Sequence, residues 1–148
     1  MSDYLKECIK DIDEPINSSA TTPATKDVFM VDENEEILDL AKAKKFHSIV
    51  AKLLCISKRA RLSLQYVVGF LTTRVQAPNK SDWRKLRRTL LYINGTIDMV
   101  RILSLNQLME LDILMDAAYA THPDMRSHTG GCVQAGDGVC TADILNRV

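Results

Sequence analysis

Three apolar stripes at helical spacing between residues 46 and 94 constrain the fold of this chain most strongly. Apolar residues that recur every three or four positions predict amphipathic helices that pack on one another. The stripes are Phe46, Ile49, Val50, Leu53 and Leu54; Leu64, Val67, Val68, Leu71 and Val75; and Trp83, Leu86, Leu90 and Ile93. The last helix is expected over residues 81–94, with Ser81 as N-cap and Gly95 as a left-handed C-cap.

Shorter apolar runs follow this region and predict strands. Residues 111–117 predict a central strand that buries Asp116. A strand interior disfavours aspartate, so we expect a partner group to stabilise the charge there. Residues 99–103 predict another strand, and residues 132–135 and 139–141 predict a hairpin around a Gly-Asp-Gly turn. Helices followed by strands indicate an α+β fold.

The charges are strongly segregated although the formal net charge is zero. Residues 1–40 carry a net charge of −8, residues 41–101 carry +12 and residues 102–148 carry −4. A cationic block of this size is the electrostatic footprint expected of a protein that binds a phosphate backbone. The cations that we expect to contact phosphates are Lys58, Arg59, Arg61, Arg84, Arg87 and Arg88.

These patterns divide the chain into three regions. Residues 1–40 are expected to form an acidic arm and linker, with a short helix near its start and a surface acidic stretch over residues 32–39. Residues 41–97 form the basic helical region, and residues 98–148 form the strands. The longest uncharged stretch is shorter than the roughly 18 residues of a membrane span, and no signal peptide opens the chain. Scattered cysteines indicate reduced thiols, so we expect a cytoplasmic or nuclear protein without a membrane partner.

Two other chemistries are weaker interpretations of the C-terminal region. His122, His128, Cys132 and Cys140 are zinc-ligand types, but their spacing matches no standard zinc site. A nucleophilic pair of Cys132 and His128 lacks an orienting partner.

Residues 116–131, Asp-Ala-Ala-Tyr-Ala-Thr-His-Pro-Asp-Met-Arg-Ser-His-Thr-Gly-Gly, resemble the start of the RNase H domain in copia-type long-terminal-repeat retrotransposon polyproteins. Other segments resemble the region between the polymerase palm and RNase H in the same family. These segments are residues 46–54, 57–61, 70–75, 82–86 and 91–96. The resemblance covers about residues 1–140.

This resemblance implies a three-helix, thumb-like block followed by the first strands of an incomplete RNase H-like sheet. It also implies that Asp116 is the first of several carboxylates that hold two Mg²⁺ ions in the parent enzyme, a reverse transcriptase with hybrid ribonuclease activity. The palm motif and the later RNase H carboxylates do not occur in this sequence. We therefore expect a fragment that has no catalysis of its own, holds no Mg²⁺ stably at its incomplete site, and has RNA/DNA hybrid or duplex nucleic acid as its partner.

Further partners implied by the resemblance are the rest of the polyprotein or a second copy, bound through uncovered strands. Two alternative functions remain open. One is a non-catalytic nucleic-acid-binding module that uses the basic helices. The other is an interaction protein whose acidic residues 32–39 mask its own basic face.

Overall fold

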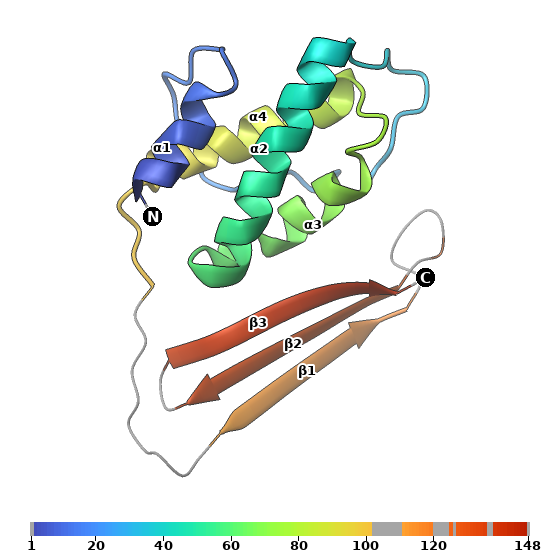
Figure 1. The fold of residues 1–148 in the computed structure, drawn as a ribbon. Helices are drawn as coiled ribbons and strands as arrows, with labels where there is room; N and C mark the ends of the chain where they lie inside the picture. The colour runs from blue at the N-terminus through green and yellow to red at the C-terminus, as the bar shows by residue number, and fades with distance from the viewer. Residues whose placement is uncertain (1, 102–110, 120–124, 126, 136–137, 148) are drawn as a thin grey trace.

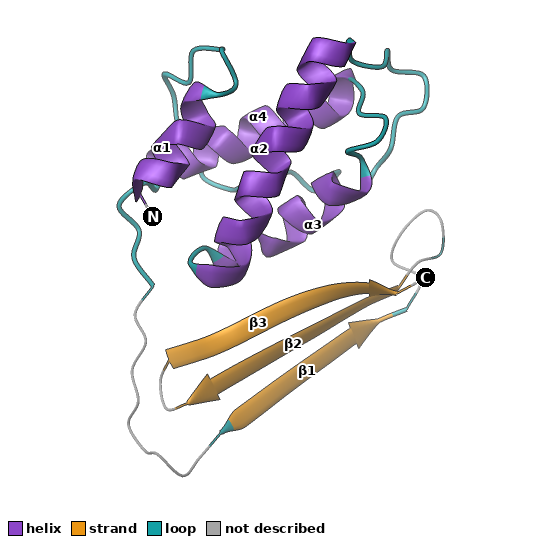
Figure 2. Cartoon of the chain, in the orientation of Figure 1, coloured by secondary structure: helices purple, strands orange, loops and turns teal. Residues whose placement is uncertain are grey.

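The computed structural model describes residues 2–101, 111–119, 125, 127–135 and 138–147, and its fold is α+β (Figure 1). A helical block precedes a three-stranded sheet (Figure 2). The helices are α1 (Ser2–Lys10), α2 (Leu40–Arg59), α3 (Gln65–Thr73) and α4 (Lys80–Gly95), with a 3-10 turn at Leu62–Leu64 before α3. No helix in these described ranges is long and apolar enough to span a membrane.

The predicted helical stripes form the core of this block. Phe46, Ile49 and Leu53 of α2 are fully buried, as are Leu86 and Leu90 of α4. Leu54 is an exception, because the buried face of α2 continues through Ile56 and Ser57 and leaves Leu54 exposed.

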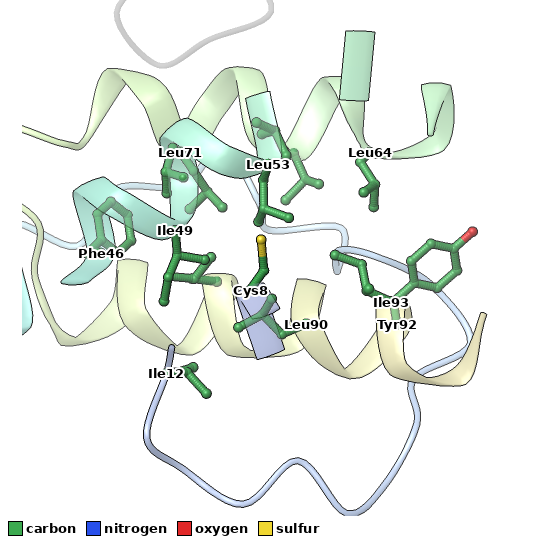
Figure 3. Packing of buried hydrophobic residues seen from close by; sticks show 14 of the residues in the cluster. Cys8, Ile12, Phe46, Ile49, Leu53, Leu64, Leu71, Leu90, Tyr92 and Ile93 are labelled. Carbon is green, nitrogen blue, oxygen red and sulfur yellow. The ribbon is translucent and has the colours of Figure 1, made fainter. Parts of the chain in front are cut away.

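The first forty residues contribute to the same core. Leu5 and Cys8 of α1 are buried, as are Ile12 and Val28 in the chain that follows. Figure 3 shows Cys8 packed among side chains that include Leu53 of α2 and Leu90 of α4. The segment that was expected to be an arm is therefore packed against α2 and α4 in this structure.

The caps of α4 differ from the prediction. Asn79, not Ser81, is the N-cap: its side chain accepts a hydrogen bond from the Asp82 backbone N–H, and the Asp82 carboxylate accepts one from Asn79 N–H. This reciprocal capping box satisfies two free donors at the start of the helix. Gly95 is the last helical residue and not a left-handed cap. A Cβ at Gly95 would lie 2.6 Å from the Ser19 Cβ, so the close approach of this segment favours glycine there.

The sheet is an antiparallel meander of β1 (Asp112–Ala118), β2 (Ser127–Ala135) and β3 (Gly138–Arg147), in that spatial order. In this sheet β1 is an edge strand, so the prediction that residues 111–117 form a central strand was wrong. Strand β3 lies closest to α2 and α3 (Figure 1). Residues 99–101 are irregular where a strand was predicted, and the rest of that prediction falls outside the described residues.

Candidate nucleic-acid interface

Asp116 lies on β1 opposite Gly130 of β2. Its side chain is exposed, contrary to the expected burial, because side chains on both faces of β1 are largely open to solvent. Asp112 lies four residues earlier on the same face, about 13 Å away along the strand, which is too far for both carboxylates to hold one metal ion.

Within the described part of the chain, no group of three histidine, cysteine or acidic side chains is placed to hold a metal ion. For the zinc interpretation, His122 and the side chains of His128 and Cys140 lie outside this description. The weaker interpretation of a nucleophilic pair depends on the same His128 side chain, while Cys132 is described and half-buried. The Gly-Asp-Gly turn also lies largely outside the described residues.

Helix α4 carries five cations, and each of them bonds to the segment of residues 14–36, which we call the acidic segment. The pairs are Lys80 with the Glu36 carboxylate, Arg84 with the Glu35 carboxylate, Lys85 with the Met30 carbonyl, Arg87 with the Glu14 carboxylate, and Arg88 with the Thr22 hydroxyl. Three of the predicted phosphate contacts, Arg84, Arg87 and Arg88, are therefore bonded to groups of the acidic segment.

Local geometry reinforces these contacts. The hydrogen bond to Glu35 raises the pKa of Arg84, and the hydrogen bond to Glu36 raises the pKa of Lys80. Glu14 also accepts a hydrogen bond of 2.8 Å from the indole N–H of Trp83. Glu35 and Glu36 thus favour the charged forms of Arg84 and Lys80.

Lys85 lies in a different environment from the other cations of α4. It is half-buried, its ammonium nitrogen lies 4.5 Å from the centre of the Phe70 ring, and desolvation lowers its pKa. A groove of about 800 Å³ runs beside it between α4 and the acidic segment. The groove is lined by both charge signs, including Asp27, Asp32, Arg84 and Arg88, so its charge does not single out an anionic ligand.

Arg61 is buried, with only 3% of its surface exposed. Its guanidinium donates hydrogen bonds to the Thr96 carbonyl at 2.8 Å and to the Thr96 hydroxyl at 2.5 Å. It also lies 5.7 Å from the centre of the Tyr92 ring. Arg61 therefore joins the end of α2 to the end of α4, and in this conformation it is not at the surface.

Lys58 and Arg59 are exposed in the last turn of α2. Because Arg61 ties that end of α2 to Thr96, these two cations lie near the C-terminal end of α4. Arg84 precedes Thr96 by twelve residues, or about 18 Å of helix. The structure therefore does not bring the six predicted cations together: Lys58 and Arg59 lie at the end of α2, Arg61 is buried, and the three arginines of α4 are bonded to the acidic segment.

Acidic residues also neutralise the outer side of α2. Lys52 bonds to Glu7 and Asp11 at 2.7 and 2.8 Å, and Lys45 pairs with Asp13. Reasoning from the sequence did not identify these carboxylates, or Glu14 and Glu36, as partners of particular cations. The sequence signal for such pairing was that residues 1–40, with a net charge of −8, directly precede residues 41–101, with a net charge of +12.

Comparison of this chain with protein-family models, with curated proteins and with solved structures gives no match.

Proposed function

We propose that this chain is the junction between reverse transcriptase and RNase H in a copia-type retrotransposon polyprotein, and that it contributes nucleic-acid binding rather than catalysis. The proposal rests on the sequence resemblance. Two structural features support it: a helical block precedes the sheet, and Asp116 lies on a strand that is followed by two antiparallel strands.

Binding is the function that the described side chains support best. The single observation that carries it is the concentration of fourteen cations in residues 41–101, five of them on α4. Arginine and lysine side chains on helices contact phosphates without reading bases, so we propose binding to duplex or hybrid with little sequence preference. This binding would weaken steeply with salt, since phosphate contacts release counterions.

A salt titration of hybrid affinity tests this function. In the variant Arg84→Gln/Arg87→Gln/Arg88→Gln, the slope of log K against log salt should become shallower by roughly 1 for each lost phosphate contact. The matched control Lys6→Gln/Lys10→Gln/Lys26→Gln removes the same charge from the first forty residues and should leave the slope nearly unchanged. Equal slopes for both variants, or a flat titration of the unmodified chain, would contradict the proposal.

Cleavage is the second part of this test. Two-metal hydrolysis needs several acidic ligands, and Asp112 and Asp116 are too far apart to share an ion. The described residues therefore do not fit the Mg²⁺ pair of the parent enzyme. We expect no cleavage of the RNA strand of a hybrid by this chain with millimolar Mg²⁺ or Mn²⁺. Cleavage that disappears in Asp116→Asn would overturn this part of the proposal.

The pairing of all five α4 cations favours a second candidate, an interaction protein whose acidic residues mask its own basic face. A flat salt titration with intact folding would favour this candidate over nucleic-acid binding.

A further inference from the structure

The acidic segment supplies three carboxylates to one stripe of α4. Glu36, Glu35 and Glu14 pair with Lys80, Arg84 and Arg87 in turn. Those three cations lie at positions i, i+4 and i+7, so they share a face of the helix and span about 10 Å along it. Three negative groups along one basic helix face are what a nucleic-acid backbone would also present to that face.

We infer that Glu14, Glu35 and Glu36 occupy the phosphate positions of the α4 face and thereby inhibit the nucleic-acid binding of this chain, an inference that rests on the proposed function. The nucleic acid must displace these carboxylates before it contacts Arg84 and Arg87. The chain then binds more weakly than its cationic block alone would bind.

The pairs are exposed enough for such displacement. The Arg84 side chain is 62% exposed and its partner Glu35 is 24% exposed, whereas Lys80 and Glu36 are 55% and 72% exposed. Exposed ion pairs contribute little free energy, so a polyanion can compete with them. A buried pair would instead resist exchange, as we expect for Arg74 with Asp82, whose side chain is 1% exposed.

The backbone beneath these carboxylates stays attached during the exchange. Val28 and Leu38 are buried in the core, and the Leu38 N–H donates a hydrogen bond of 2.9 Å to the Pro78 carbonyl. The Lys80 N–H donates one of 3.0 Å to the Glu36 carbonyl. Release of Arg84 and Lys80 from their partners therefore needs only rotation of the Glu35 and Glu36 side chains. It needs no unfolding of the acidic segment.

Glu35 provides the sharpest test, since Glu14 also bonds Trp83 and its loss would disturb the core. The control is Glu33→Gln. It removes the same charge two residues away, from an exposed side chain that has no ion pair within the described residues. Each full-length variant is titrated with a fluorescent RNA/DNA hybrid at low salt, after circular dichroism has shown that its folding is intact.

Glu35→Gln should tighten binding about two- to fivefold, the range expected for release of one ion pair whose arginine is exposed and whose carboxylate is partly buried. Glu33→Gln should tighten it by less than about 1.5-fold, because a charge without a direct partner acts only through screened long-range attraction. The double variant Glu35→Gln/Arg84→Gln should lose this gain in affinity, since the freed Arg84 guanidinium is the group that contacts phosphate.

Equal affinities for the two glutamate variants would overturn the inference, because net charge alone would then explain the change. An undiminished gain in the Arg84→Gln background would also overturn it. Absence of binding by the unmodified chain and by every variant is a different result: it would refute the proposed function itself, and the inhibition with it.

Discussion

Apolar residues of the same type are buried in the helical block and exposed in β1 of the sheet. Ile49 of α2 is 0% exposed, whereas Ile113 of β1 is 65% exposed. The apolar residues of α2 meet those of α1, α3 and α4, but Leu114 and Met115 of β1 remain largely open to solvent. An apolar pattern therefore specifies which residues favour burial, while burial itself requires a partner surface that another element must provide.

Hydrogen exchange should show the largest difference between the two regions. We expect amides of residues 50–54 to be protected about a thousandfold more than those of residues 113–117, because β1 is an edge strand with few buried contacts. Mass spectrometry of the purified monomer measures this ratio. Equal protection in a monomer would mean that the sheet is stable by itself. Protection of β1 that rises with protein concentration would indicate self-association through this edge.

Shortening one isoleucine side chain in each region should lower the free energy of unfolding by different amounts. Ile49→Ala leaves a cavity in the core, so we expect it to lower the free energy of unfolding by about 2–5 kcal/mol. Ile113→Ala removes the same atoms from an exposed strand and should lower it by less than about 1 kcal/mol. Urea unfolding followed by the fluorescence of Trp83, the single tryptophan, provides the measurement. Similar losses for both variants would show that β1 is buried in solution.

The pH dependence of stability should depend on a thiol in the helical block. Burial raises the pKa of Cys8 from 9.0 to about 11. Because the folded pKa lies above the unfolded one, this contribution is complete below pH 9 and is lost as pH rises through 11. We expect the loss to be about 2 kcal/mol, which is the smallest of the three expected effects.

Urea unfolding at several pH values checks this expectation, with Cys8→Ala compared against Cys132→Ala. Stability of Cys8→Ala should fall less between pH 8.5 and 11 than that of the unmodified chain. Cys132, which is only half-buried in β2, serves as the control, and its variant should keep the original slope. Identical slopes in all three proteins would show that Cys8 does not contribute.

The helices were predictable because local spacing alone defines their buried faces. Trp83, Leu86, Leu90 and Ile93 recur at helical intervals and are buried as predicted. The contribution of residues 1–40 to the core was missed, since Leu5 and the residues near it form no long periodic run. The edge position of β1 was also missed, because spacing along a strand does not reveal the order of strands in a sheet.

The candidate interface was predictable as a charge pattern but not as a surface. The excess of cations over residues 41–101 is a property of the sequence alone. Which cations remain exposed depends on contacts between distant residues, such as Arg84 with Glu35 and Arg61 with Thr96. Those contacts are 49 and 35 residues apart in the chain.

The positions of the helices and the division of charge along the chain follow from the order of residues alone, because helix periodicity and composition are local properties. Contacts between distant residues, formed on folding, bury Arg61 and place the cations of α4 against the acidic segment. The order of strands in the sheet likewise places Asp116 on an exposed edge. The physical reason is that burial and ion pairing depend on distances in space, which packing of the whole core fixes.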